Sequence, residues 1–128
     1  MITTVEQRAQ ALQLWLDLRN ALQNECKRFN THPALTERVP APTLCFEPVS
    51  ETEVRLHLHS QQGDFWLSVV IDPDLFYILY RAHAEPDTCM ALIDVDEQGA
   101  FLTTRDHKPD LLEDAANAMV NTLIVGYL

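Results

Sequence analysis

Apolar side chains recur every three or four residues from Val5 to Phe29, the spacing that places them on one face of an α-helix. Overlapping capping-box patterns begin at Thr3 and Thr4, each with a Glu or Gln three residues later. Such patterns mark the start of a helix. Together, these signals predict one long N-terminal helix that ends near Phe29.

This predicted helix is apolar over more of its surface than a helix beside a single core needs. Leu14 and Leu18 widen the apolar stripe to well over half of the circumference between residues 12 and 22, whereas about 100° is enough to face a core. Either the helix is deeply buried in its own domain, or part of this face contacts a second copy or a partner. In the second case we expect a homodimer with Leu14, Trp15 or Leu18 near the contact.

A proline-rich segment separates the helix from the first predicted strand. Three prolines lie within residues 31–43. Prolines so close together disfavour a helix and predict an extended connector. The next segment, Leu44–Val49, is predicted to be a weak strand at a sheet edge, because Pro48 has no backbone N–H to donate to a neighbouring strand.

Two stronger strand patterns follow, over Thr52–His59 and Phe65–Ile71. The first pattern alternates strictly between polar and apolar residues, which is typical of a strand with one buried face. The second is a continuous apolar run, which indicates a more central strand. A turn at residues 61–64 joins the two strands.

The segment Asp72–His83 carries two competing signals. An Asp-Pro-Asp tripeptide at its start supplies an N-cap, a proline at the first helical position and an acid in the first turn. Tyr77, Ile78 and Tyr80 favour a strand instead. We predict a short helix here, whereas a strand would make the domain a six-stranded meander between helices.

The rest of the chain predicts a hairpin and a final helix. Thr88–Val95 and Ala100–Thr104 are predicted strands, and Gly99 suits the left-handed position that closes the loop between them. Pro109 and the acids after it predict the start of the last helix. The element order is therefore αβββαββα, an α+β fold with helices packed on an antiparallel sheet. A length of 128 residues indicates a single domain over residues 1–128.

Acidic residues are concentrated in the later part of the chain. Nine Lys and Arg stand against 19 Asp and Glu, and residues 41–128 hold fifteen of these acids. The formal net charge of −10 repels phosphate backbones and anionic lipid, so we expect no nucleic-acid or membrane partner and favour a cationic protein. No apolar stretch is long enough to cross a bilayer, no secretory signal pattern is present, and three scattered cysteines indicate reduced thiols in a cytoplasmic protein.

The candidate catalytic and metal-binding motifs are incomplete. His57-x-His59 places two imidazoles on one strand face, but no third ligand has convincing spacing. Asp94-x-Asp96-x-x-Gly99 is similar to the start of a calcium loop, yet an arginine occupies the position of the bidentate carboxylate, so a hairpin turn explains these residues. The chain also lacks a glycine-rich phosphate loop and a nucleophile elbow. We therefore expect no enzyme activity, no cofactor and no metal requirement.

With this element order, the chain resembles the class I chaperones of bacterial type III secretion, the CesT-like family. The stretch most similar to that family is Met90–Leu102, an apolar strand, an acidic turn with a glycine, and a second apolar strand. The resemblance implies an acidic cytoplasmic homodimer that holds an extended segment of an effector protein around its surface. It also implies a groove over the first helix and the first strands, whose counterparts here are Leu18, Leu44, Phe46 and Leu56.

Three functions stay open on these observations. The first is a chaperone-like module that binds an extended partner segment through apolar surface. The second is an acidic inhibitor, immunity protein or regulator that occupies a basic surface on a nuclease or a DNA-binding protein. It would bind through an acidic face formed by Asp72, Asp74, Asp94, Asp96 and Glu97. The third is a ligand-binding or enzymatic domain whose site cannot be recognised in a single sequence.

Overall fold

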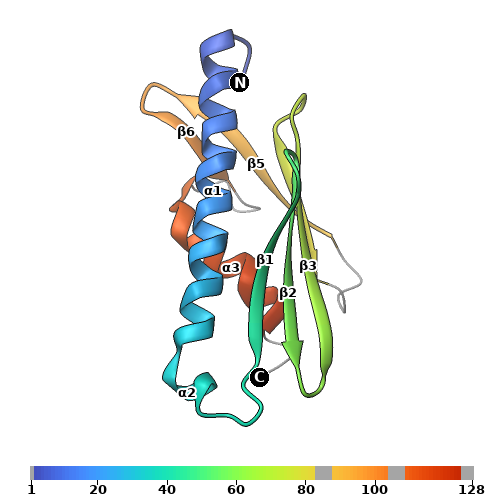
Figure 1. The fold of residues 1–128 in the computed structure, drawn as a ribbon. Coiled ribbons are helices and arrows are strands. Elements are labelled where there is room, and N and C mark those ends of the chain that lie inside the picture. Colours follow the sequence, from blue (N-terminus) through green and yellow to red (C-terminus); the bar gives the residue numbers. More distant parts are fainter. Residues whose placement is uncertain (1, 83–87, 104–108, 125–128) are drawn as a thin grey trace.

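A computed structural model of the protein shows an α+β fold in which helices pack on an antiparallel sheet (Figure 1). The structure describes residues 2–82, 88–103 and 109–124. The helices are α1 (Val5–Thr31), α2 (Pro33–Thr36) and α3 (Leu112–Ile124). The strands are β1 (Thr43–Ser50), β2 (Glu53–Ser60), β3 (Gly63–Asp72), β4 (Tyr77–Ala82), β5 (Cys89–Asp96), β6 (Gly99–Thr103) and β7 (Pro109–Asp110). Each strand pairs with the next one along the chain, which confirms the predicted fold class and makes the sheet a meander with β1 at one edge.

The predicted capping box forms at the start of α1. The Thr4 hydroxyl accepts a hydrogen bond from the Gln7 backbone N–H at 3.1 Å, and the Gln7 side-chain oxygen accepts one from the Thr4 backbone N–H at 3.1 Å. The pair satisfies two of the backbone donors that a helix leaves unpaired at its N-terminus. The helix then runs to Thr31 and spans the length of the molecule (Figure 1).

The connector after α1 is less extended than its prolines predict. Pro33 occupies the start of the one-turn helix α2, where a missing N–H is tolerated, and the His32 Nδ1 accepts a hydrogen bond from the Ala34 N–H at 3.2 Å. The prediction of a fully extended segment was therefore wrong over Pro33–Thr36.

No helix in the described part of the chain is long and apolar enough to cross a membrane.

The short helix predicted within Asp72–His83 is absent, and strand β4 takes its place; His83 lies outside the described residues. The Asp72 carboxylate accepts hydrogen bonds from the N–H groups of Asp74 and Leu75, each at 2.9 Å, as in a helix cap. Here, however, those bonds close a tight turn, because Phe76 has a φ of 55° and reverses the chain. The middle helix on which the resemblance to the secretion chaperones partly rests is thus a strand, and the sheet is a continuous meander.

The last helix begins later than predicted. Pro109 and Asp110 form the short strand β7, which pairs with β6, and α3 starts at Leu112. Glu113 and Asp114 still lie in the first turn of α3, where their charges complement the positive end of the helix dipole.

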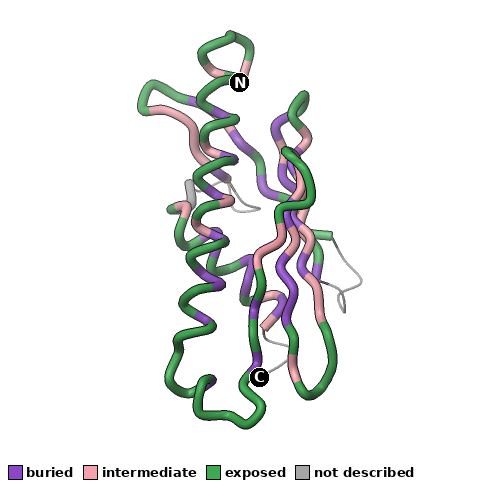
Figure 2. The backbone as a smooth tube through the Cα atoms, in the orientation of Figure 1, coloured by how far each residue is buried: buried purple, intermediate pink, exposed green. Residues whose placement is uncertain are grey.

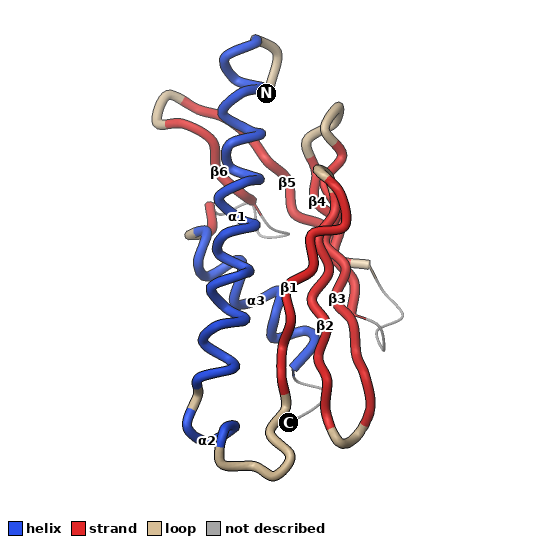
Figure 3. The backbone as a smooth tube through the Cα atoms, in the orientation of Figure 1, coloured by secondary structure: helices blue, strands red, loops and turns tan. Residues whose placement is uncertain are grey.

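The hydrophobic core lies between the helices and one face of the sheet. Figure 2 shows buried positions along α1, α3 and the central strands, which together form the core. In α1 the core residues are Ala11, Trp15, Leu18, Leu22, Cys26 and Phe29. Strands β5 and β6 diverge from β1–β3, so that the sheet curls around the helices (Figure 3). Deep burial in the chain's own core therefore accounts for most of the wide apolar face of α1, while Leu12 and Leu16 remain 42% and 47% exposed.

Helix α1 also covers the outer edge of strand β1. The Asn30 side-chain amide donates to the Leu44 carbonyl oxygen and accepts from the Leu44 N–H, both at 2.8 Å. Nearer the middle of α1, the Trp15 Nε1 donates to the carbonyl oxygen of Glu51, in the turn that follows β1, at 2.8 Å. The predicted edge position of this strand is confirmed, but part of the edge is occupied by the chain itself.

Candidate functional site

The described helices pack on one face of the sheet, and we call the opposite face the outer sheet face. Side chains alternate along each strand, so β2 directs Val54, Leu56 and Leu58 into the core and the residues between them outward. Because the strands are in antiparallel register, outward residues on neighbouring strands line up in rows. Two such rows are Glu47–Arg55–Ser68–Arg81 and Glu53–Val70–Leu79–Met90.

Apolar side chains cluster across the middle strands of the outer sheet face. Val70, Leu79 and Met90 are direct cross-strand partners, and Tyr77 pairs with Leu92 in the adjacent row. We call these five residues the apolar strip. Met90 is 54% exposed and Leu92 is 42% exposed, although neither lies in a loop. A contiguous apolar patch on a sheet face is an arrangement typical of interaction surfaces.

Cationic and aromatic side chains border the apolar strip on one side. The Arg55 guanidinium lies 5.5 Å from the centre of the Trp66 ring and 3.4 Å from the Glu53 carboxylate. Arg55, Ser68 and Arg81 stand side by side on three strands and line a shallow depression together with Trp66. On this side of the outer sheet face, two arginines therefore stand beside the carboxylates of Glu47 and Glu53.

Acidic residues border the apolar strip on the other side. The Asp72 carboxylate caps the β3–β4 turn, and the backbone hydrogen bonds from Leu75 and Asp74 hold its pKa below the ordinary value. Asp72 also accepts a hydrogen bond from the Tyr77 hydroxyl, which raises the pKa of that phenol. Asp94 accepts a hydrogen bond from the Val95 N–H at 2.8 Å.

The five residues of the predicted acidic face do not form one patch. Asp72 and Asp74 belong to the β3–β4 turn, whereas Asp94, Asp96 and Glu97 belong to the β5–β6 hairpin. Figure 1 shows these two hairpins diverging from one another. Asp96 also has a local structural role, because its carboxylate accepts a hydrogen bond from the Gln98 N–H within the turn at 2.8 Å.

The residues predicted to line a partner groove lie in the core. Leu18, Leu44 and Leu56 are at most 1% exposed and belong to the same core cluster, and the half-buried Phe46 packs against it. Among the residues predicted at a dimer contact, Trp15 and Leu18 are buried in this core and Leu14 is half-buried. In this fold, a partner therefore cannot reach the buried members of either set.

A cluster of histidines lies near the β2–β3 turn, on the outer sheet face. His57 and His59 have ring centroids 3.6 Å apart, and the His57 ring stacks on Trp66 at 3.6 Å. The Asp64 carboxylate lies 3.1 Å from the His59 Nδ1 and 3.7 Å from the His57 Nε2. Asp64 is the third potential ligand that sequence reasoning missed. The sequence feature that could have revealed it is the short turn after β2, because this turn makes Asp64 the direct cross-strand partner of His59.

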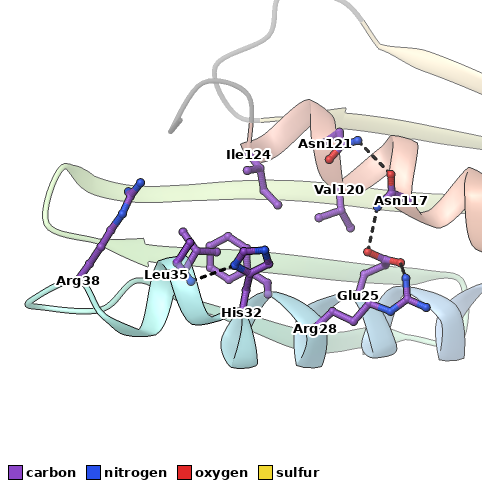
Figure 4. A pocket seen from close by; sticks show the side chains of 11 residues that line it. Glu25, Arg28, His32, Leu35, Arg38, Asn117, Val120, Asn121 and Ile124 are labelled. Carbon is purple, nitrogen blue, oxygen red and sulfur yellow. Dashed lines mark hydrogen bonds and ion pairs between the residues drawn. The ribbon is translucent and has the colours of Figure 1, made fainter.

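A pocket of about 400 Å³ lies on the helical side of the molecule, where the C-terminal part of α1 meets α2 and α3 (Figure 4). Its lining is mostly apolar and includes Phe29, Leu35, Val120 and Ile124. The buried Glu25 carboxylate lies at one end. It accepts hydrogen bonds from Arg28 at 3.1 Å and from the Asn117 amide at 3.3 Å.

Comparisons with protein-family models, with curated proteins and with solved structures returned no match. The resemblance to the class I secretion chaperones therefore stays an interpretation of the element order and of the Met90–Leu102 hairpin.

Proposed function

We propose that this protein is a non-enzymatic protein-binding module that holds an amphipathic segment of a partner protein on its outer sheet face. The observation that supports this function best is the apolar strip, in which Val70, Leu79 and Met90 stand in direct register across three strands. Met90 and Leu92 remain about half exposed at the centre of a regular sheet. Covering such side chains with an apolar surface is favourable, at roughly 25 cal/mol per Å² buried.

The composition of the apolar strip suits recognition of a protein segment. Methionine is flexible and polarisable, so it adapts to partner side chains of different shape. A tyrosine presents both a large apolar ring and a hydrogen-bonding hydroxyl, which is why tyrosines are enriched at interfaces. Tyr77 offers this combination between Asp72 and Leu92.

Binding on the sheet face is better supported than strand addition at the edge. An added strand needs free backbone N–H and C=O groups. At β1, both groups of Leu44 are engaged by Asn30. Our proposal therefore keeps one feature of the chaperone-like function suggested by the sequence, the binding of a partner segment. It places the binding site on the apolar strip instead of over the first helix and the first strands.

Charge around the apolar strip defines the partner segment more closely. Asp72 and Asp94 flank one side, and Arg55 and Arg81 flank the other. The matching segment has an apolar face, cationic residues toward the two aspartates and an acidic or polar residue toward the arginines. The overall charge of −10 favours the approach of a cationic partner.

The test uses charge insertions on the apolar strip. Once a partner has been isolated by pull-down and purified, we expect its affinity to fall at least tenfold in Met90→Asp and Leu92→Asp, a loss equivalent to about 1.4 kcal/mol or more. Val49→Asp is the matched control, because Val49 is 50% exposed on the edge strand β1. Circular dichroism verifies that all three variants are folded.

Salt dependence separates this function from that of an acidic inhibitor. Binding through the apolar strip survives high salt, whereas binding through exposed carboxylates is screened over a few ångströms at molar ionic strength. If salt abolishes binding while Met90→Asp and Leu92→Asp bind normally, the acidic residues carry the interaction and our proposal is wrong.

A second candidate function, binding of a small apolar ligand, rests on the pocket between α1, α2 and α3. Its volume of about 400 Å³ lies within the range of small-molecule sites. The buried Glu25 and the exposed Asn117 provide polar groups beside an apolar lining. Native mass spectrometry of freshly purified protein tests for a bound ligand. Val120→Trp, which places a large ring in the pocket, should remove any ligand signal that belongs there.

A further inference from the structure

We propose that His57, His59 and Asp64 form a binding site for zinc at the end of the β2–β3 hairpin. His57 and His59 lie two residues apart on one strand and therefore project from the same face. The turn at residues 61–62 then returns the chain so that Asp64 is the cross-strand partner of His59. The proposal is independent of the apolar strip, which lies on β4, β5 and the opposite end of β3.

The ligand atoms lie close to the spacing that a tetrahedral ion needs. One ligand atom from each of the three residues lies within 4.8 Å of the others. The Asp64 Oδ1 is 3.1 Å from the His59 Nδ1 and 3.7 Å from the His57 Nε2. Nitrogen and oxygen ligands about 2.0–2.2 Å from a tetrahedral zinc lie roughly 3.3–3.6 Å apart. The two separations from the Asp64 Oδ1 bracket this range.

The His57 Nε2 is the strongest single indication of a ligand. The His57 side chain is only 9% exposed, and its Nε2 is buried without a hydrogen bond among the described residues. A buried polar atom without a partner is rare and costs about 1–3 kcal/mol. This nitrogen faces the Asp64 carboxylate at a separation of 3.7 Å. That gap is too long for a hydrogen bond, but an ion coordinated by both atoms would bridge it.

Neighbouring side chains hold the His57 ring in place. Trp66 stacks on the ring at 3.6 Å, and the Glu47 carboxylate from β1 lies 3.8 Å from the His57 Nδ1. A histidine that binds a metal through one nitrogen usually presents its other ring N–H to a carboxylate or a carbonyl. At 3.8 Å the Glu47 carboxylate faces the His57 Nδ1 without a hydrogen bond, and a rotation of the half-exposed Glu47 side chain would bring it into contact, so we assign Glu47 as a positioning residue.

The chemistry of the three ligands selects the metal. Two imidazoles and one carboxylate suit zinc and similar transition-metal ions, whereas calcium and magnesium prefer ligand sets made of oxygen alone. Three protein ligands leave the fourth position of zinc open to water or to a donor from another molecule. The hydrophobic core does not include His59 or Asp64, so the chain is expected to fold without the ion and to gain stability when it binds.

The experiment is calorimetric titration of zinc chloride into the full chain, free of purification tags and stripped with EDTA. We expect one ion per chain, with affinity reduced at least about 100-fold in His59→Gln and in Asp64→Asn. Both residues are exposed, so these variants should keep the circular dichroism spectrum of the native protein. Glu47→Gln should weaken zinc binding about tenfold while leaving the melting temperature of the metal-free protein unchanged.

Control variants exclude other zinc-binding groups. Cys45 and Cys89 are exposed thiols, and His32 is a histidine outside the cluster. Zinc affinity should be unchanged in the double variant Cys45→Ser/Cys89→Ser and in His32→Gln. Cobalt bound in place of zinc should give the visible absorption of a tetrahedral site without thiolate charge-transfer bands. The proposal is overturned if native protein shows no saturable zinc binding, if His59→Gln and Asp64→Asn bind normally, or if the cysteine variant loses the site.

Discussion

The Asn30 side-chain amide makes two hydrogen bonds with the backbone of Leu44, each 2.8 Å long. The pair imitates the contact that a neighbouring strand would provide, but it comes from the last turn of α1. It attaches the end of the long helix to the edge of the sheet, and it occupies backbone groups that would otherwise invite another strand. At Leu44, therefore, the edge of β1 is closed to an added strand, which is one reason for our proposal that a partner binds the outer sheet face instead.

Replacing Asn30 tests this attachment. Asn30→Ala removes both hydrogen bonds to Leu44, and we expect the free energy of unfolding to fall by about 1–2 kcal/mol. Urea unfolding followed by circular dichroism measures the change. Asn24→Ala is the matched control, since Asn24 lies on the same helix, is exposed, and offers the same gain in helix propensity. Equal stability of the two variants would show that the contact contributes nothing.

Truncation of core leucines tests the placement of residues that the sequence assigned to a partner surface. Leu18→Ala and Leu56→Ala should each lower the free energy of unfolding by about 2–5 kcal/mol, because both side chains are completely buried. Leu16→Ala should lower it by only about 0.5 kcal/mol, because Leu16 is 47% exposed on the same helix as Leu18. Small effects at all three positions would place Leu18 and Leu56 on a free surface instead.

The three cysteines should differ sharply in reactivity. Burial raises the pKa of the Cys26 thiol to about 12, and the nearby Cys45 and Glu25 add to the shift. Because only the thiolate reacts, Cys26 should resist a thiol reagent at pH 8. Cys45 and Cys89 are exposed and should react promptly. A colorimetric thiol assay should therefore find two reactive groups in the native protein and three after unfolding. Rapid reaction of all three would contradict the burial of Cys26.

The β3–β4 turn should lose stability in acid. Backbone hydrogen bonds from Leu75 and Asp74 lower the pKa of Asp72 in the folded protein relative to the unfolded chain. The stabilisation is therefore fully present above the unfolded pKa, which is about 3.9 for an aspartate, and is lost as the pH falls through the lower folded value. The difference in melting temperature between the native protein and Asp72→Asn should shrink over that range. Asp74→Asn serves as the control, since the Asp74 carboxylate accepts neither hydrogen bond.

The homodimer stays a prediction, but the burial of side chains on α1 reduces the number of residues that could form its contact. Trp15 and Leu18 are buried within one chain and Leu14 is half-buried, so we expect a contact through α1 to be centred on Leu12 and Leu16, which are 42% and 47% exposed. Light scattering should then give twice the chain mass of 14.6 kDa for the native protein and a single chain mass for Leu16→Asp. A native protein that is monomeric at micromolar concentration would refute the homodimer.

Local signals in the sequence predicted most of the secondary structure. The capping box at Thr4, the strict alternation of β2 and the apolar run of β3 each report on neighbours within a few residues, and each appears in the structure as expected. The error at Asp72 has the same origin. The pattern Asp-Pro-Asp satisfies backbone donors equally well in a helix cap and in a tight turn, so it cannot decide which follows.

The sequence by itself determined the long helix, the antiparallel strands and the acidic charge, because these follow from spacing and composition along the chain. Only the tertiary structure decided which apolar residues are covered. Leu44 and Leu92 look alike in their strand patterns, yet one is buried beneath α1 and the other is 42% exposed on the outer sheet face. The side of the sheet on which the helices pack makes this difference. The same holds for His57, His59 and Asp64, since only the pairing of β2 with β3 brings the third potential ligand to the two histidines.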